Sequence, residues 1–142
     1  MERRNFIRLS LAGAVGAGMI APTIALADSS KLAVGADIYY TKEAPGRWSG
    51  KVTTHSPSIE IEKAGGKVTV KIVTAHEMKG YEHYIVKHVL LDQNYKFIDE
   101  RLFDPIKDQA ARSIFTLHDY SGPIYALSLC NKHDLWLNGA EV

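Results

Sequence analysis

The chain has 142 residues, a length typical of one domain, and 46% of them are hydrophobic, which is enough for a globular core. The formal net charge is +1, and so balanced a chain argues against nucleic acid as a partner. The only cysteine is Cys130, so an intramolecular disulfide is excluded.

Residues 1–27 have the pattern of an export signal. Arg3 and Arg4 form a twin-arginine pair, a glycine-rich apolar run over 9–24 follows, and residues 25–27 are a small-x-small cleavage site. The apolar run is short for a membrane-spanning helix. We therefore expect a twin-arginine signal peptide over 1–27, a mature domain over 28–142 with no membrane segment, and a periplasmic or otherwise exported location.

The start of the mature chain is rich in turn-forming residues. Residues 28–54 predict an irregular arm with one short strand near Asp37–Tyr40. Beyond the arm, polar and apolar residues alternate with a period of two, and turn signals separate the runs. The alternation predicts strands over 58–62, 67–74, 83–91, 95–103, 111–118, 123–130 and 135–137. About seven short strands with no helical period predict an all-β fold, an immunoglobulin-like antiparallel β-sandwich.

A lone cysteine is unusual in an exported protein, because export compartments oxidise free thiols. Cys130 fits three descriptions: a buried inert core residue, a reactive thiol that carries a group covalently, or a metal ligand. The Cys130-Asn131-Lys132-His133 spacing favours the metal ligand, because a turn of this length brings a thiolate and an imidazole onto one ion.

Other histidines lie where β-sandwiches build sites. His55 precedes a predicted strand, His76 follows one, and His83 opens the next. Together with the Cys-x-x-His turn they indicate one metal site. His88 is five residues after His83, an odd offset that places it on the opposite face of a strand, so we interpret it and His118 as non-ligands.

Three segments carry a family resemblance. Residues 125–136, YALSLCNKHDLW, resemble the C-N-x-H-G-x-W signature of superoxide reductases, the family of neelaredoxin and the iron-binding domain of desulfoferrodoxin. HEM at 76–78 and EHYI at 82–85 resemble their H-P-x and E-H-[YWH]-I stretch, and THSPSIE at 54–60 resembles their K-H-V-P-x-I-E. The resemblance spans about 37–136 and implies an immunoglobulin-like sandwich of the one-iron type, since no N-terminal C-x-x-C pair is present.

The resemblance also implies a metal, a reaction and partners. The metal is one mononuclear non-haem iron per chain, Fe(2+)/Fe(3+), which reduces superoxide to hydrogen peroxide by one-electron transfer and takes its electron from an unidentified external donor. The axial thiolate pushes electron density toward an open position. Relatives often form dimers or tetramers, so a homo-oligomer is expected. Carried over, the ligands are four equatorial imidazoles and the axial thiolate: His55, His76, His83, His133 and Cys130.

The sequence departs from the family pattern around the first histidine. Thr53 and Thr54 stand where the family has Glu-Lys, which weakens the pull on an anion. We name Thr54 and Lys51 as the catalytic candidates, with Lys51 the first of three lysines that could replace the missing charge; the others are Lys79 and Lys132.

Two further departures concern single residues. Glu77 replaces the usual proline after the second histidine, and Asp134 replaces the glycine of C-N-x-H-G, which places an acidic group near the site. Asn131 and Lys132 are candidates for backbone hydrogen bonds to the sulfur.

Three functions remain open on the sequence alone. The first is an iron oxidoreductase of the superoxide reductase type. The second is a non-enzymatic iron-binding or electron-transfer protein that keeps the ligands without the Glu-Lys pair, and the third is a sandwich that carries sulfur on Cys130.

Overall fold

The computed structural model describes residues 37–142, so the predicted signal peptide lies outside the described residues. No helix in this part of the chain has the length and apolar character needed to cross a membrane. Seven strands make up most of it: β1 (Ser58–Ala64), β2 (Lys67–Glu77), β3 (Ile85–Leu91), β4 (Phe97–Leu102), β5 (Ala110–His118), β6 (Pro123–Cys130) and β7 (Asp134–Glu141).

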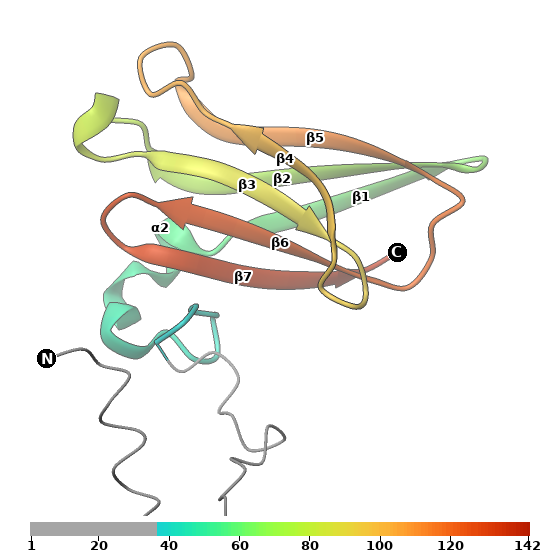
Figure 1. Ribbon diagram of the computed structural model, residues 1–142, viewed down its shortest axis with the longest axis horizontal. Helices are drawn as coiled ribbons and strands as arrows, with labels where there is room; N and C mark the ends of the chain where they lie inside the picture. The colour runs from blue at the N-terminus through green and yellow to red at the C-terminus, as the bar shows by residue number, and fades with distance from the viewer. Residues whose placement is uncertain (1–36) are drawn as a thin grey trace, which may run out of the picture. The chain divides into compact units, whose positions relative to one another are not determined.

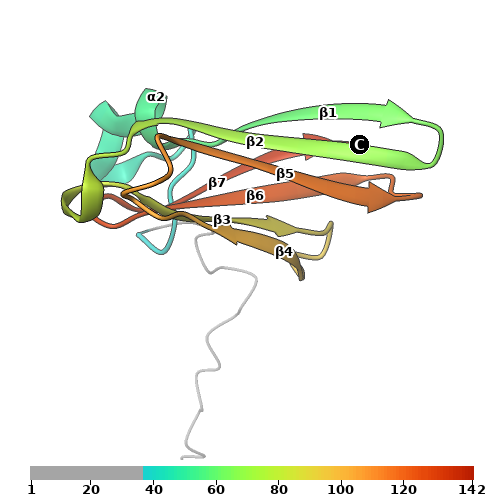
Figure 2. The ribbon, with the colours of Figure 1, turned by 90° about the horizontal axis from the view of Figure 1, so that it is seen from above.

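The strands form two antiparallel sheets that pack face to face (Figures 1 and 2). One sheet has the order β1-β2-β5 and the other β4-β3-β6-β7. The prediction of an antiparallel β-sandwich of about seven strands is confirmed. The strand ends differ from the prediction by a few residues, most at β7, which continues to Glu141.

The core follows from the period-two pattern. On β2 the residues Val68, Val70 and Ile72 are at most 3% exposed and face β6, where Ile124 and Ala126 are fully buried. Each strand contributes every second side chain to the space between the sheets. The hydrophobic alternation that predicted the strands is therefore also what holds the two layers together.

The arm before β1 differs from the prediction. No strand forms over Asp37–Tyr40; only Tyr40 bridges to Trp136, with its N–H on the Leu135 carbonyl. A 3-10 helix, η2 (Gly46–Lys51), and one α-helical turn, α2 (Val52–His55), follow it. Such short helices show no hydrophobic period, so the sequence pattern could not indicate them.

Candidate metal centre

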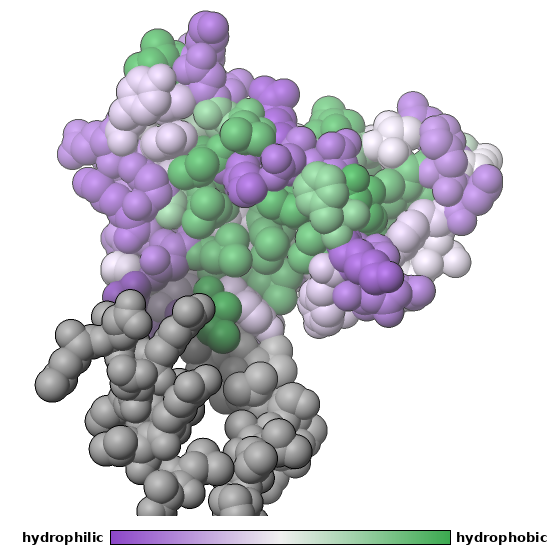
Figure 3. Space-filling model, in the orientation of Figure 1, coloured by the Kyte–Doolittle hydropathy of each residue, from purple (hydrophilic) through white to green (hydrophobic). Residues whose placement is uncertain are grey.

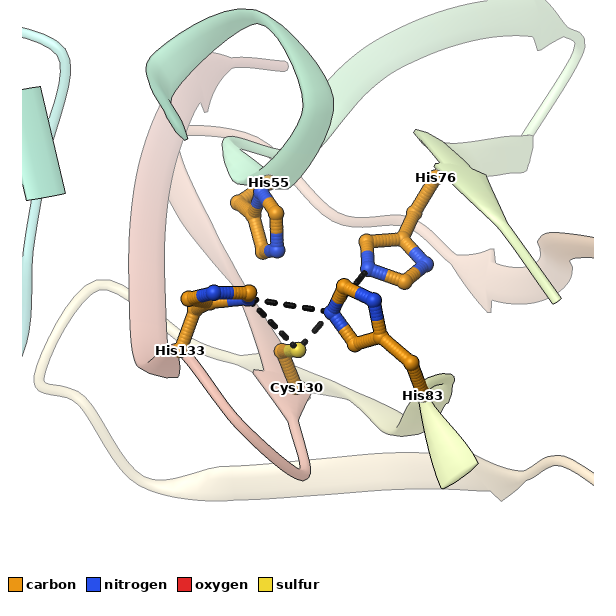
Figure 4. Close-up of side chains that lie close together, drawn as sticks. All are labelled: His55, His76, His83, Cys130 and His133. Carbon is orange, nitrogen blue, oxygen red and sulfur yellow. Dashed lines mark hydrogen bonds between the residues drawn. The ribbon is translucent and has the colours of Figure 1, made fainter. Parts of the chain in front are cut away.

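Five side chains converge at one end of the sandwich (Figure 4). Each offers one ligand atom, and these atoms all lie within 4.8 Å of one another. The Nε2 atom of His83 lies 3.0 Å from His76 Nε2 and 3.0 Å from His133 Nδ1, and Cys130 Sγ lies 3.6 Å from His133 Nδ1. The structure brings together all five residues that the sequence predicted as ligands: His55, His76, His83, Cys130 and His133.

His55 is the last residue of α2 and is 2% exposed. Its Nδ1 lies 3.1 Å from the Lys51 carbonyl and 2.8 Å from Thr54 Oγ1. A carbonyl can only accept, so the ring proton sits on Nδ1 and the lone pair of Nε2 is free. Nε2 is buried and has no hydrogen-bond partner within residues 37–142. A buried lone pair that accepts no hydrogen bond and lies within 4.8 Å of four other possible ligand atoms fits a metal ion.

His76 and His83 lie where regular strand pairing stops. On β2 the register with β5 shifts between Thr74 and Glu77, so His76 falls inside the irregular stretch. His83 follows the short helix η3 (Gly80–Glu82) and pairs with Lys79 in an isolated bridge. The bulge and the helix turn both imidazoles toward the centre, where their rings meet edge to face at 4.4 Å.

Cys130 ends β6 and is 2% exposed in an apolar cluster with Ile85, Phe103 and Ala111. The backbone N–H of Lys132 lies 3.4 Å from Sγ. This amide has the place that the sequence suggested for it, and a donor of this kind stabilises a thiolate and tunes a bound metal.

Asn131 has a different role from the one suggested by the sequence. Its backbone N–H donates to the Tyr84 carbonyl rather than to sulfur. Its side-chain Oδ1 accepts from the Tyr84 N–H, and its Nδ2 donates to the carbonyls of Tyr81 and Glu82. Asn131 therefore ties the Cys130–His133 turn to the segment that carries His83.

The imidazoles of the cluster favour the neutral form. Burial, with a smaller effect from His76, lowers the pKa of His55 to about 4. Burial also lowers the pKa of His76, His83 and His133, and for the last two Lys51 and Lys132 add to the effect. A metal binds the neutral ring, so the protein holds these side chains in the state that a ligand requires. Four neutral imidazoles and one thiolate form a donor set that suits iron.

The two catalytic candidates lie beside His55. Thr54 is exposed, with its hydroxyl between His55 Nδ1 and the Lys51 carbonyl, 3.3 Å from the latter. Lys51 is half-buried, and within residues 37–142 its ammonium makes no ion pair. In contrast, Lys79 pairs with Glu77 at 2.8 Å and Lys132 approaches Glu82 at 3.9 Å.

Asp134 has neighbours that sequence reasoning missed. Its φ is 63°, in the region that favours glycine. Its carboxylate accepts from the Arg47 guanidinium and, at 2.8 Å, from the Trp48 indole, and both hold the pKa of Asp134 below its usual value. Trp48 in turn contacts the ring of His133 edge to face at 4.7 Å. Because Arg47 neutralises Asp134, the expected repulsion of an anion is reduced.

The two remaining histidines lie away from the cluster. His88 is fully buried between the sheets, and His118 is exposed at the end of β5. Neither belongs to the group of possible metal ligands in the described part of the chain. Trp136 packs beside the site, 6.0 Å from the ring of His55, and donates to the His133 carbonyl at 2.9 Å.

Comparisons with known proteins agree with this geometry. Residues 47–139 match the family model described as desulfoferrodoxin. The superoxide reductase of Pyrococcus abyssi is 31% identical over 109 residues, which cover 68% of this chain and 92% of that protein. The solved structure of superoxide reductase (neelaredoxin) from Ignicoccus hospitalis is 26% identical and has a TM-score of 0.62 over 75% of this chain and 94% of that one. A hypothetical protein from Pyrococcus horikoshii, 27% identical, has a TM-score of 0.56 over 63% of this chain and 89% of that one.

Proposed function

This chain belongs to the desulfoferrodoxin family, and from that premise we propose that it is a mononuclear iron protein that reduces superoxide to hydrogen peroxide. The observation that carries the proposal is the group of four imidazole nitrogens and one cysteine sulfur within 4.8 Å of one another. An iron ion held by these atoms would supply one electron to each superoxide, which with two protons gives hydrogen peroxide. An external electron donor, which the sequence does not identify, would then reduce the iron again.

The side chains around the group would guide an anion to it. His83 and His133 are half-buried, whereas His55, His76 and Cys130 are buried, so solvent reaches the cluster past the first two. Lys51 is near both half-buried rings, since its charge adds to the effect of burial in lowering the pKa of each. We propose Lys51 as the cation that replaces the lysine missing at Thr54, because the other two lysines near the site have carboxylate neighbours.

Thr54 would act by orientation rather than by charge. Its hydroxyl lies 2.8 Å from His55 Nδ1, on the side of the ring opposite the cluster. Groups that hold the outer nitrogen of a ligating imidazole fix the ring and its tautomer.

The function is tested on the iron-loaded protein with a superoxide pulse. The ferrous form should be oxidised rapidly, with one hydrogen peroxide formed per iron, and the ferric form should show a thiolate-to-iron charge-transfer band. Cys130→Ser should lose that band. Stoichiometric iron with slow or absent oxidation by superoxide would refute the enzymatic proposal.

A non-enzymatic iron-binding or electron-transfer protein is the second candidate, and the uncharged Thr53 and Thr54 favour it. Thr54→Lys separates the two: a large gain in rate over a slow wild type would show that the natural site lacks a catalytic cation. The sulfur-carrier hypothesis is disfavoured, because Cys130 is 2% exposed, whereas reactive thiols are typically partly exposed.

We also propose export by the twin-arginine route, on the basis of Arg3, Arg4 and the apolar run that follows. Expression in a bacterium should give a periplasmic protein that begins at Asp28, and Arg3→Lys with Arg4→Lys should leave it in the cytoplasm. N-terminal sequencing and cell fractionation measure both outcomes. Periplasmic protein from the double variant would contradict the proposal.

The outer face of the four-stranded sheet supports a homo-oligomer. Figure 3, which looks onto this face, shows a broad apolar band. It contains outward side chains of β6 and β7, and four of these are large and half-buried: Tyr125, Leu127, Leu129 and Leu135. The outer face of the other sheet instead carries charges such as Glu60, Lys71 and Arg112. An antiparallel sheet normally has one solvated polar face, so the apolar face indicates a partner.

We propose that the partner is a second copy. Four strands ~4.8 Å apart and about seven residues long cover roughly 450 Å² per chain. The exposed Phe97 and Leu102 on β4 enlarge the face, so two copies approach the ~1,000 Å² of a specific interface. Sedimentation should give twice the chain mass for wild type and for Ile114→Lys, a control 65% exposed on the other sheet, but a monomer for Leu127→Lys. A monomeric wild type at all concentrations would refute it.

A further inference from the structure

A chain of four polar side chains crosses the interior of the sandwich. His88 is fully buried, and both ring nitrogens are bonded: Nε2 to Thr74 Oγ1 at 2.9 Å and Nδ1 to Ser113 Oγ at 2.8 Å. The Thr74 hydroxyl also bonds the Ser128 hydroxyl at 2.8 Å. All three hydroxyl residues are at most 3% exposed. The chain connects β5, β3, β2 and β6, and thus joins the two sheets.

These four hydrogen-bonded side chains lie directly below the metal centre. Thr74 precedes His76 by two residues on β2, and Ser128 precedes Cys130 by two residues on β6. Residues two apart on a strand point to the same face and lie about 7 Å apart. The Thr74–Ser128 bond therefore connects the strands of a histidine ligand and the cysteine ligand one layer beneath them.

Two of the strand pairings become irregular at the same level. The β2–β5 register shifts immediately after Thr74, and the β3–β6 register shifts between Ile85 and Lys87, next to His88. His76 consequently has no partner in the β2–β5 ladder. Cys130 pairs with Ile85 just beyond the β3–β6 bulge and keeps a regular pairing with Asp134 of β7. The ring of His88 also meets Phe103 edge to face at 4.9 Å, and Phe103 packs in the apolar cluster of Cys130.

We propose that His88 is a positioning residue of the metal centre. By holding Thr74, and through Thr74 holding Ser128, it sets the separation of β2 and β6 and hence the distance between the His76 imidazole and the Cys130 thiolate. The inference rests on the proposed metal site, and it assigns a task to a histidine that is not a ligand. A polar layer that served stability alone would not act on the ligands selectively.

Two variants at one position test this selectivity. In His88→Gln the side-chain amide reaches the place of Nε2, so the bond to Thr74 is kept and the bond to Ser113 is lost. In His88→Asn the amide takes the place of Nδ1, so the bond to Ser113 is kept and the bond to Thr74 is lost. Each variant loses one buried hydrogen bond, and the two should lose similar stability.

The probe is Co²⁺ added to the metal-free protein, read by its thiolate-to-cobalt absorption band and by its affinity. His88→Gln should resemble wild type. His88→Asn should bind Co²⁺ about tenfold more weakly, which is a usual loss of affinity when a residue that supports a ligand is changed, and its absorption band should be shifted. Thr74→Val, which removes the central hydroxyl while keeping the side-chain shape, should behave like His88→Asn and gives a second measurement if that variant does not fold.

The outcomes separate the two proposals. Equal affinity and an unchanged band in wild type, His88→Asn and Thr74→Val would overturn the positioning role and leave the metal site standing. Equal losses in His88→Gln and His88→Asn would also overturn it, since they would show general destabilisation. A wild type that binds no Co²⁺ and no iron would overturn the proposed function itself.

Discussion

The buried histidine between the sheets makes folding stability depend on pH. Burial, and to a lesser extent the charge of Arg101, lowers the pKa of His88 from 6.5 to about 4. Its hydrogen-bond partners are the hydroxyls of Thr74 and Ser113, which offer no negative charge to an imidazolium. The folded protein therefore keeps His88 neutral, while the unfolded chain binds a proton below pH 6.5.

The sign and the size follow from this difference. Above pH 6.5 both states are neutral at His88 and stability does not change with its titration. As the pH falls from 6.5 to about 4 the unfolded state gains the proton, so the free energy of unfolding decreases. The lowering of the His88 pKa from 6.5 to about 4 corresponds to about 3 kcal/mol, a large part of the stability of a small domain.

The assay is urea unfolding of wild type and His88→Leu from pH 7 to pH 4. At pH 7 the variant should be the less stable, because the hydroxyls of Thr74 and Ser113 lose a partner. Toward pH 4 the difference in the free energy of unfolding should shrink by about 3 kcal/mol, since only wild type has a histidine that must stay neutral in the folded state. The other ionisable groups are common to both proteins, so their contributions cancel in the difference. His118→Leu is the matched control, because His118 is exposed, and its curve should run parallel to wild type. Parallel curves for wild type and His88→Leu would refute the reasoning.

Further predictions concern the residues that surround the metal centre. Asp134→Gly should free the Trp48 indole and shift its fluorescence to longer wavelength. Asp134→Asn keeps an acceptor for the indole N–H and should give a spectrum near that of wild type. Identical spectra for the two variants would show that the carboxylate does not hold the indole. Lys51→Met should slow oxidation of the ferrous protein by superoxide several-fold at low ionic strength, and the difference should narrow in high salt. Lys79→Met is its control, because Glu77 already neutralises that lysine. Equal rates in wild type and Lys51→Met would remove Lys51 from the proposal.

The sequence predicted the sandwich and all five members of the group that could hold a metal ion, and the physical reasons for the two predictions differ. Alternation reports burial directly, so strands such as β2 and β6 were found with small errors at their ends. The cluster was found because the histidines and Cys130 lie in three short segments that resemble a family pattern. Helix α2 was missed, since one turn has no period to detect.

Contacts between distant segments were also missed. Arg47 and Asp134 are 87 positions apart, and no pattern in either segment indicates the other. His88 was correctly separated from the ligands, although the argument for it assumed a strand from His83, whereas β3 begins at Ile85. Its partners Thr74 and Ser113 belong to β2 and β5, and no local sequence signal specifies how these strands pack against the other sheet. Short-range pattern thus predicts which residues are buried, and only the fold shows which buried polar groups meet.

The position of the centre explains why hydrogen bonds of side chains are so prominent around it. Its candidate ligands come from α2, from the ends of β2 and β6, from the segment between β2 and β3, and from the turn after β6. All of these lie at one end of the sandwich (Figure 1). Loops tolerate the irregular backbone that a five-ligand site needs, but they lack the ladder bonds that fix a strand. Asn131 joins two of these segments, Asp134 joins the arm to the β6–β7 turn, and the His88 layer braces the strands beneath. Each of these contacts adds a restraint at the end of the sandwich where the β2–β5 and β3–β6 pairings are irregular. Variants that remove these contacts should therefore weaken metal binding while the protein stays folded. Variants of the apolar core such as Ile72→Ala should instead lower the stability of the fold while leaving metal binding by the folded protein unchanged.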